Sequence, residues 1–375
     1  MRVLINASII TEKHTGYATV VSNYIYELSA YLTKESKNLE IYVLLQEKAY
    51  RSFFRNMELN KNIKFIVVKN FSIIGRLLYD QVLINYFLYK YNCDVLHSPA
   101  TIGTIFSIRP QILFFHASTT FMLPRDMHGR GFLATWLSNI IIKYSALKSK
   151  KVLTTSNVTG KELESFLGKE IEFIPIYNGI PLIDENYKDI NIRKNIIDLE
   201  NKKFIFYISS FYKLKNQELL VNTAKLNKDY IFVIGGSPVQ KSYYDYCVNL
   251  AKEIDNVIIF DSLNFDEVKF LYKHTNIYIC PSFFEGFALT PLEALIFNKP
   301  ILLANTDILK EVYGEDFLYF DPNNPESLNS VIEKVDEHYI EICTNNKILK
   351  KYSWNNFLLS NLKVYDKFNE MNFEK

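Results

Sequence analysis

The segment IYICPSFFEGFALTPLEAL, residues 277–295, changes from a strand pattern to a helix pattern across one short loop. Its first residues, Ile277–Cys280, are apolar on both faces, which is typical of a buried parallel strand. Pro291 suits the first turn of a helix, where its missing N–H costs nothing. A helix that begins here offers unpaired backbone N–H groups and a positive dipole end, so the loop is suited to bind a phosphate.

Short apolar runs of the same kind recur along the whole chain, with helical patterns between them. Apolar residues at helical spacing occupy intervening segments such as 19–32, 217–226 and 266–273. This alternation of strands with helices predicts doubly wound α/β sheets. The expected strands are residues 3–9, 41–45, 63–68, 112–115 and 152–154, and then 204–208, 230–234, 257–260, 277–280, 301–304 and 318–320.

The strand series breaks at Asn178–Gly179, a turn signal that is followed by Pro181 and a charged stretch up to Lys203. We place a linker over residues 178–202. The expected parts are an N-terminal α/β domain, a C-terminal α/β domain and a terminal helix that packs back on the first domain. Their bounds are 1–178, 179–352 and 353–375. Ligands of open parallel sheets bind beyond the carboxyl ends of the strands, so candidate functional residues are sought there.

Length and composition exclude several classes of protein. With 375 residues, 48% of them hydrophobic and 22% charged, the chain is long enough for two domains and too apolar to be disordered. A net charge of +2 argues against a globally basic nucleic-acid binder. The four cysteines lie far apart, without a C-x-x-C pair, which disfavours a disulfide framework or a zinc site. No apolar run approaches the roughly 20 residues of a membrane-spanning helix.

The charge is divided unevenly between the two halves of the chain. Residues 1–180 carry 21 Lys and Arg against 13 Asp and Glu, whereas residues 181–375 carry 22 against 28. A basic, aromatic stretch from Arg125 to Lys151 is a candidate for docking on an anionic membrane surface. A core-packed helix with a solvated basic end explains the same pattern equally well, and both alternatives stay open.

Two carboxylates flank the predicted phosphate-binding loop. Glu285 precedes the helix and Glu293 lies inside it. Either carboxylate would repel a phosphate that it touched. We therefore interpret both as acceptors for hydroxyl groups on either side of the phosphate, such as those of a sugar and a ribose. Two ordinary surface glutamates are the alternative.

The same segment resembles the E-G-F-x-L-x-x-L-E-A signature of the family 4 retaining GT-B glycosyltransferases, the glycosyl transferases group 1. The matching residues are Gly286, Phe287, Leu289, Leu292, Glu293 and Ala294. The resemblance implies the GT-B fold, with two Rossmann-like domains and an inter-domain cleft. It also implies an acceptor-side first domain and a second domain that binds a nucleotide sugar.

The resemblance extends to the segment YISSFYKLKN, residues 207–216, which is similar to the family's Y-V-G-x-L-x-P-R-K-N. Lys215 matches the phosphate-binding lysine of that motif. Ser210 replaces a frequent arginine, and Leu214 replaces the arginine of P-R-K-N. Lys213 is the candidate that compensates for them.

In the first half, Gly16 matches one glycine of the family's T-G-I-G-R-Y loop, while Ala18 stands at the second glycine position. Gly16 is expected to let the backbone approach a ligand. The run ILFFH, residues 112–116, resembles the strand that ends in a histidine facing the donor sugar. His116 is therefore the catalytic candidate, although Ala117 replaces the usual following Asp. We expect His97 to be structural.

The resemblance also implies a role for each residue around the donor. Glu293 would accept hydrogen bonds from the ribose hydroxyls. Glu285, which with His116 is a catalytic candidate, would accept them from the sugar hydroxyls. The diphosphate would be held by Lys215 and by the backbone of the loop that leads into the helix. The loop residues concerned are Gly286, Phe287, Ala288 and Leu289.

The resemblance implies a retaining hexosyltransferase of cell-surface polysaccharide synthesis, such as lipopolysaccharide or capsule synthesis. It would use a sugar-nucleotide donor and a saccharide or lipid-linked acceptor, in the cytoplasm or peripherally at the inner face of the cell membrane. Because the chain lacks a D-x-D motif, we expect no metal ion. We also expect no other cofactor and, from the net charge of +2, no nucleic-acid partner. A sugar-nucleotide 2-epimerase and an inactive sugar-nucleotide-binding partner are the alternatives. P-loop and dinucleotide motifs are absent from the sequence.

Overall fold

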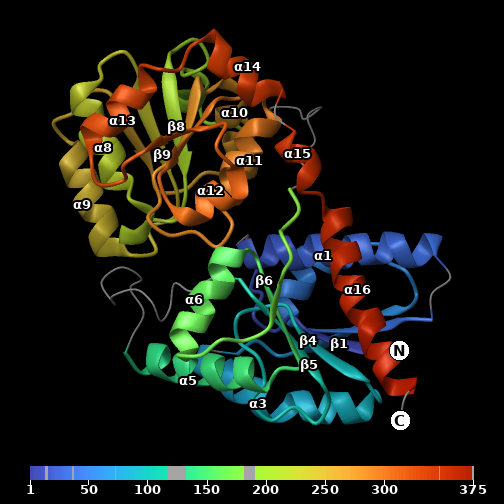
Figure 1. Cartoon of the computed structure of the whole chain (residues 1–375). Coiled ribbons are helices and arrows are strands. Elements are labelled where there is room, and N and C mark those ends of the chain that lie inside the picture. Colours follow the sequence, from blue (N-terminus) through green and yellow to red (C-terminus); the bar gives the residue numbers. More distant parts are fainter. Residues whose placement is uncertain are drawn as a thin grey trace. The chain divides into compact units, whose positions relative to one another are not determined.

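The computed structural model describes residues 1–12, 16–35, 38–71, 73–116, 132–180, 191–345 and 347–373. The chain divides into two compact units (Figure 1). Unit 1 is built from residues before 180 together with those after 351, and unit 2 is built mainly from residues 180–351. Each unit contains its own parallel sheet, so the predicted architecture of two Rossmann-like α/β sheets is confirmed.

Unit 1 holds a seven-stranded sheet in the order β3-β2-β1-β4-β5-β6-β7, in which all neighbouring strands are parallel. Its strands are β1 (Arg2–Asn6), β2 (Glu40–Gln46), β3 (Ile63–Val68), β4 (Val95–Ser98), β5 (Gln111–Phe115), β6 (Lys151–Thr154) and β7 (Phe173–Pro175). Its helices include α1 (Gly16–Lys34), α3 (Ile73–Lys90), α5 (Phe132–Lys148), α6 (Asn157–Leu167) and α16 (Trp354–Phe373). Short helical turns, α2 (Glu47–Ala49) and η1 (Tyr50–Phe54), follow β2.

The central strands of this sheet are buried on both sides, because helices cover both of its faces. Helices α1 and α16 pack on the face that presents Val3 and Ile5, and α3 packs on the face that presents Leu4. The Tyr24 hydroxyl of α1 donates a hydrogen bond to the Tyr365 hydroxyl of α16 over 2.8 Å. The C-terminal helix is therefore part of the core of unit 1.

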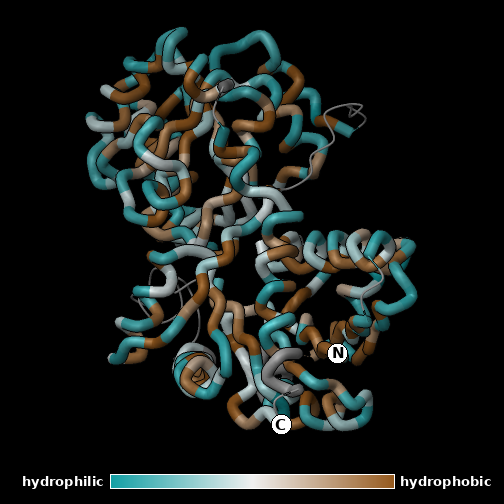
Figure 2. Tube along the Cα trace, turned by 45° about the vertical axis from the view of Figure 1, so that its right-hand side comes forward, coloured by the Kyte–Doolittle hydropathy of each residue, from teal (hydrophilic) through white to brown (hydrophobic). Residues whose placement is uncertain are grey.

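Unit 2 holds a six-stranded parallel sheet in the order β10-β9-β8-β11-β12-β13. Its strands are β8 (Phe204–Ile208), β9 (Ile231–Gly235), β10 (Val257–Phe260), β11 (Ile277–Cys280), β12 (Ile301–Ala304) and β13 (Leu318–Phe320). Its helices are α7 (Lys194–Ile197), η2 (Lys213–Lys215), α8 (Gln217–Leu226), α9 (Lys241–Ala251), α10 (Phe265–His274), α11 (Leu289–Ile296), α12 (Asp307–Tyr313), α13 (Pro325–Ile332), α14 (Glu337–Asn345) and α15 (Ile348–Lys351). Figure 2 shows the apolar strands inside each unit as brown segments.

The strand orders locate the edges where ligands are expected. In unit 1 the order reverses between β1 and β4, and in unit 2 it reverses between β8 and β11. The loops that leave the carboxyl ends of such a strand pair diverge to opposite faces of the sheet, and ligands of open α/β sheets bind in the resulting crevice. The motif of residues 277–295 begins at one of these strands, β11.

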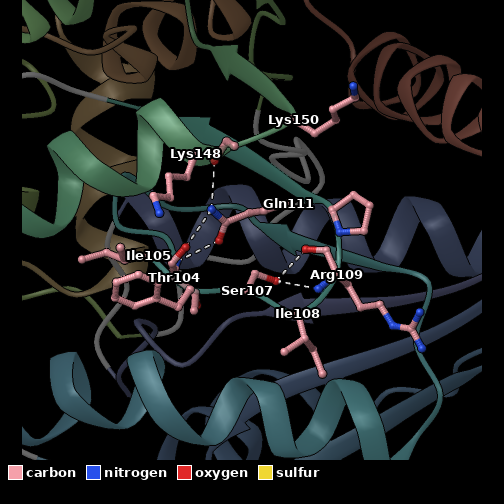
Figure 3. A pocket seen from close by; sticks show the side chains of 11 residues that line it. Thr104, Ile105, Ser107, Ile108, Arg109, Gln111, Lys148 and Lys150 are labelled. Atoms are coloured by element: carbon pink, nitrogen blue, oxygen red, sulfur yellow. Dashed lines mark hydrogen bonds between the residues drawn. The ribbon is translucent and has the colours of Figure 1, made fainter.

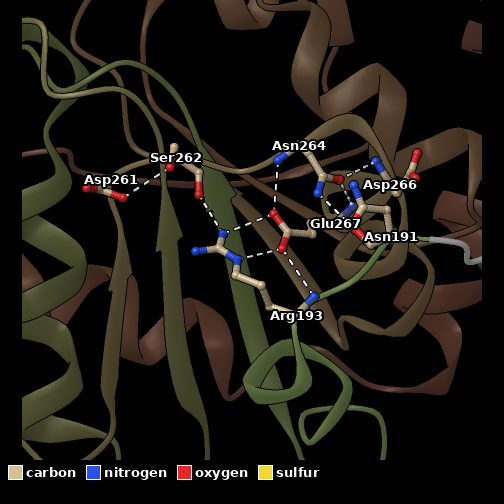
Figure 4. Close-up of polar contacts among 7 residues, drawn as sticks. All are labelled: Asn191, Arg193, Asp261, Ser262, Asn264, Asp266 and Glu267. Atoms are coloured by element: carbon tan, nitrogen blue, oxygen red, sulfur yellow. Dashed lines mark hydrogen bonds and ion pairs between the residues drawn. The ribbon is translucent and has the colours of Figure 1, made fainter.

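The linker is narrower than the sequence indicated. Within the expected linker 178–202, residues 194–197 form helix α7, and Arg193 binds α10 of unit 2 (Figure 4). The Arg193 guanidinium contacts the buried Glu267 carboxylate, with Nη2 and Oε2 3.0 Å apart, and donates to the Ser262 carbonyl over 2.6 Å. Burial by itself would raise the pKa of Glu267, but hydrogen bonds from Arg193 and from backbone N–H groups hold it below its ordinary value. Residues 181–190, the centre of the expected linker, lie outside the described residues.

No helix among the described residues is both long enough and apolar enough to span a bilayer.

Candidate active site

The loops that follow β8 and β11 lie against each other at the reversal point of unit 2. The backbone N–H of Phe283, after β11, donates to the carbonyl of Leu214, after β8, over 3.0 Å. Asn216 adopts a left-handed backbone conformation with a φ of 57°, and its side-chain amide donates to the Pro281 carbonyl over 3.1 Å. The hydroxyls of Tyr207 and Ser282 are 3.0 Å apart. These buried contacts fix the loop that carries Lys215.

Lys215 and Glu285 form an ion pair at this point. The Lys215 Nζ lies 2.7 Å from Glu285 Oε1, and it donates to the Phe284 carbonyl over 3.3 Å. Both side chains are mostly buried, with 18% and 15% of their surfaces exposed. An ammonium has three N–H donors, so these two contacts leave it the capacity to bind a phosphate oxygen as well. The structure thus brings together two residues that the sequence placed 70 positions apart.

Helix α11 begins directly after the loop that contains Glu285. Its N-cap residue, Ala288, has a φ of 58° and a ψ of 74°, which is rare for a residue with a Cβ and is found most often at functional sites. The Tyr313 hydroxyl donates to the Ala288 carbonyl and holds this turn in place. Because the first N–H groups of a helix have no partner inside it, the end at Leu289 is suited to bind an anion. Pro291 lies in the first turn, as predicted.

Glu293 lies on α11, one turn after its start. The Tyr272 hydroxyl donates to Glu293 Oε2 over 2.8 Å and also contacts the Thr290 carbonyl. Burial raises the pKa of the Glu293 carboxyl, and the hydrogen bond from Tyr272 offsets part of that increase. The contact with Tyr272 fixes the orientation of the carboxylate and leaves Oε1 as a hydrogen-bond acceptor for a ligand.

The loop after β9 adds a feature that the sequence reasoning missed. Gly236 has a φ of +151°, and a Cβ built on it would lie 1.8 Å from the Ser209 carbonyl oxygen after β8. Only glycine allows this close approach. The hydroxyls of Ser210 and Ser237 are 3.2 Å apart beside it. The pair of glycines after the predicted strand 230–234 was the signal available in the sequence.

Lys213 lies on the same loop as Lys215. It is exposed, and its backbone N–H donates to the Gln240 side chain over 3.1 Å. The structure therefore places Lys213 near the end of β8, as the sequence suggested. Its action as a phosphate helper stays a prediction.

His116 occupies the corresponding edge of unit 1, directly after β5. Its ring stacks on Phe114 with centroids 4.3 Å apart and meets the Tyr17 ring edge-on at 5.2 Å. The Tyr17 and Thr101 hydroxyls are 2.8 Å apart, and Thr101 also accepts a hydrogen bond from the His116 backbone N–H. Tyr17 lies at the start of α1, the helix after β1, and Thr101 lies in the loop after β4. Tyr17 stands at the isoleucine position of the T-G-I-G-R-Y loop and Thr101 belongs to no motif, so neither stood out in the sequence.

The His116 imidazole is neutral at physiological pH. Burial lowers its pKa to about 4, although a hydrogen bond with the Pro99 backbone acts in the opposite direction. Among the residues that the structure describes, Nε2 has no hydrogen-bond partner. If Nδ1–H is the donor to Pro99, Nε2 carries a lone pair that can accept a hydrogen bond from a ligand hydroxyl.

The remaining candidates of unit 1 have different outcomes. His97 is structural, as expected: it is buried, and its Nδ1 lies 2.5 Å from the Tyr365 hydroxyl of α16. Gly16 begins α1, and a Cβ built there would meet no atom within 4 Å. The fold itself therefore does not require glycine at this position, and contact of Gly16 with a ligand stays a prediction. Ala117 and residues 125–131 lie outside the described residues.

Comparison with known proteins relates this arrangement to a family. Residues 188–347 match the model of the family described as glycosyl transferases group 1. This part of the chain is similar to the group 1 glycosyltransferases. The resemblance inferred from the sequence is confirmed, and the Lys215–Glu285 pair, α11 and Glu293 all lie within the matched residues.

Related proteins extend the similarity beyond this domain. The chain is 24% identical to the O-antigen chain mannosyltransferase RfbU of Salmonella typhimurium, over 74% of this chain and 73% of the relative. Sucrose-phosphate synthase from Thermosynechococcus elongatus has the same fold, with a TM-score of 0.72, 13% identity and 99% of each chain covered. Anabaena HepE, solved in complex with UDP-glucose, has a TM-score of 0.69 and 14% identity, with 98% of this chain and 100% of HepE covered. The expected GT-B fold is confirmed.

Proposed function

We propose that this protein transfers a hexose-type sugar from a nucleoside-diphosphate sugar to a hydroxyl of a saccharide or lipid-linked saccharide, in cell-surface polysaccharide synthesis. The observation that carries the proposal is the Lys215–Glu285 pair beside the start of α11, at the strand reversal of the part of the chain that matches the group 1 glycosyltransferases. A lysine and a helix start offer positive charge to a diphosphate, and two carboxylates offer acceptors to hydroxyls. The mannosyltransferase RfbU and the UDP-glucose complex of HepE support a hexose donor.

The proposed reaction retains the configuration of the anomeric carbon. The bond between that carbon and the diphosphate oxygen breaks, and the acceptor hydroxyl forms a new bond on the same face of the sugar. The departing phosphate oxygen takes the acceptor's proton. Lys215 and the N–H groups at the start of α11 stabilise the charge that develops on the diphosphate. We propose that this stabilisation replaces a metal ion.

Product analysis tests the proposal directly. The purified chain is incubated with a panel of nucleoside-diphosphate hexoses and saccharide acceptors, and the products are analysed by mass spectrometry and NMR. We expect a glycoside with the anomeric configuration of the donor, in equal yield with and without EDTA. An epimerised sugar nucleotide or an unchanged donor would overturn the transferase, and an inverted product would overturn retention. Loss of activity in EDTA that magnesium or manganese restores would overturn metal independence.

Replacement of Glu293 by alanine is expected to weaken nucleotide binding at least about tenfold. The variant loses a charged acceptor for the ribose hydroxyls, and hydrogen bonds to charged groups are worth about 1.5–3 kcal/mol. Tyr272 keeps the Thr290 carbonyl as a partner, so the turn itself is preserved. Calorimetry with the nucleoside diphosphate of the preferred donor measures the effect. The matched control is Glu253→Ala, at an exposed position. Equal affinity of both variants would refute the ribose role of Glu293.

A further inference from the structure

Two neighbouring helices of unit 1 leave apolar side chains uncovered. Helices α3 and α5 contact each other and pack on the same side of the sheet (Figure 1). Their outer sides, and the loop between β4 and β5, expose Val82, Tyr86, Tyr89, Phe106, Trp136 and Tyr144, with exposed fractions from 48% to 78%. Single exposed apolar residues are ordinary. A group of them on adjacent elements marks an interaction site for a protein, a membrane or a ligand. We call these six residues the α3–α5 surface.

Hydrogen bonds and ring contacts join the parts of the α3–α5 surface. The Asn85 side chain of α3 donates to the Phe106 carbonyl over 2.7 Å and accepts from the Ile108 N–H over 3.0 Å. The Lys148 ammonium of α5 lies 4.9 Å from the centre of the Phe106 ring. The loop is therefore fixed to both helices, and its exposed Phe106 is continuous with their exposed side chains.

Helix α5 is apolar on the side that faces the sheet as well as on its outer side. Ile141, Ile142 and Ala146 are buried, whereas Trp136 and Tyr144 are exposed. The outer side also carries the exposed Lys143 and Lys148, so it combines aromatic rings with positive charge. In the described part of the chain, nothing covers the outer side of α5.

Helix α3 contains one carboxylate, Asp80, which is buried and accepts a hydrogen bond from Ser8. The other segments that build this surface carry positive charge without a carboxylate. Residues 81–93, 99–116 and 132–151 contain Lys90, Arg109, Lys143, Lys148, Lys150 and Lys151 and no Asp or Glu. A recess of about 610 Å³ lies beside Phe106, between the loop and the end of α5 (Figure 3). Lys148, Lys150 and Arg109 are among its lining residues. A second copy of this surface would bring like charges together, so charge complementarity favours an anionic partner.

We propose that the α3–α5 surface docks on the interface of a bilayer that contains anionic phospholipid. Tryptophan and tyrosine are enriched at the level of lipid headgroups, where their rings are half-immersed, and lysines are attracted to the surface potential of anionic lipids. Lys90 and Lys148 reach over the Tyr86 and Phe106 rings, so their ammonium groups are held at the level of the apolar side chains. This docking is independent of the transfer reaction and goes beyond it.

The two tryptophans of the chain make the proposal directly measurable. Trp136 is 53% exposed on the α3–α5 surface, whereas Trp354 is 3% exposed in the core of unit 1. Vesicles of phosphatidylcholine with about one third phosphatidylglycerol are titrated into the full chain without any substrate. We expect a blue shift of the tryptophan emission that is absent with phosphatidylcholine alone. Trp136→Phe should abolish the shift while the protein still floats with the vesicles.

Variants separate the apolar and the charged contributions. Lys143→Gln, Lys148→Gln and Lys150→Gln together should weaken vesicle binding about a hundredfold, since each lysine near an anionic surface contributes about fivefold. Tyr89→Ser with Phe106→Ser should weaken it at least about tenfold. Tyr246→Ser and Lys252→Gln, exposed residues of unit 2, are the matched controls. The proposal would be overturned if the protein bound neutral and anionic vesicles equally, or if the triple lysine variant bound as tightly as the wild type. A blue shift that self-association causes without vesicles would also overturn it.

Discussion

Replacing Lys215 by alanine is expected to weaken nucleoside-diphosphate binding about tenfold to a hundredfold. The proposed bond between its ammonium and the diphosphate is charge-assisted, and such bonds are worth about 1.5–3 kcal/mol. A second effect acts in the same direction. Glu285 lies 2.7 Å from Lys215 and would lose its positive partner, so its carboxylate would repel the diphosphate. Calorimetry with the nucleoside diphosphate of the preferred donor measures the change.

A double variant distinguishes these two effects. If the unpaired Glu285 contributes, Lys215→Ala with Glu285→Gln should bind the nucleoside diphosphate more tightly than Lys215→Ala alone. Lys228→Ala, at an exposed position of unit 2, is the control and should leave the affinity unchanged. Thermal unfolding verifies that each variant is folded. Wild-type affinity in folded Lys215→Ala would show that this lysine holds Glu285 and does not bind the diphosphate.

Replacing His116 by alanine should lower kcat by about 10²- to 10³-fold, the effect of removing one group that stabilises a transition state. We expect nucleotide affinity to change little, because the residues proposed to hold the nucleotide belong to unit 2. His116→Gln should retain more activity than His116→Ala, since its amide oxygen can replace the imidazole as a hydrogen-bond acceptor. Steady-state kinetics with a fixed acceptor, together with calorimetry, measures both quantities. A parallel loss of nucleotide affinity would contradict this role.

The low pKa of His116 leads to two further expected results, one for the pH dependence of kcat and one for folding stability. With a pKa of about 4 the imidazole does not titrate near pH 6.5, so kcat should be flat from pH 6 to 8. A loss of activity through a single protonation near pH 6.5 would contradict the neutral acceptor. The unfolded chain takes up this proton at about pH 6.5, so folding stability should decrease as the pH falls from 6.5 to 4. The decrease should be smaller in His116→Gln, which a urea midpoint at each pH measures.

The α3–α5 surface could be found only in part from the sequence. The stretch from Arg125 to Lys151 was one of two open alternatives in the sequence, a membrane-docking surface or a core-packed helix with a solvated basic end, and its described portion includes Trp136 and Lys148. Tyr86, Tyr89 and Phe106 had no such signal, because nothing in their spacing shows that α3 and the β4–β5 loop lie beside α5. Exposure is a property of the folded chain, and the sequence could not distinguish these side chains from core residues.

The sequence by itself determined the elements and the family. Apolar runs predicted strands such as 204–208 and 277–280, because a strand buried on both faces needs apolar residues at every position. The motif from Glu285 to Ala294 predicted the loop, the helix after it and the group 1 glycosyltransferases. These features depend on neighbours along the chain, and local patterns are sufficient to indicate them.

Only the tertiary structure decided which residues meet. The pairing of Lys215 with Glu285, the approach of Gly236 to Ser209 and the contact of Tyr272 with Glu293 join loops that follow different strands. Strand order brings these loops together, and the short apolar runs of a parallel sheet are too alike to specify their order. The low pKa of His116 likewise results from burial beneath Tyr17 and Phe114, which the fold creates. A sequence motif identifies the candidate reactive groups, whereas packing determines their protonation state and which residues they contact.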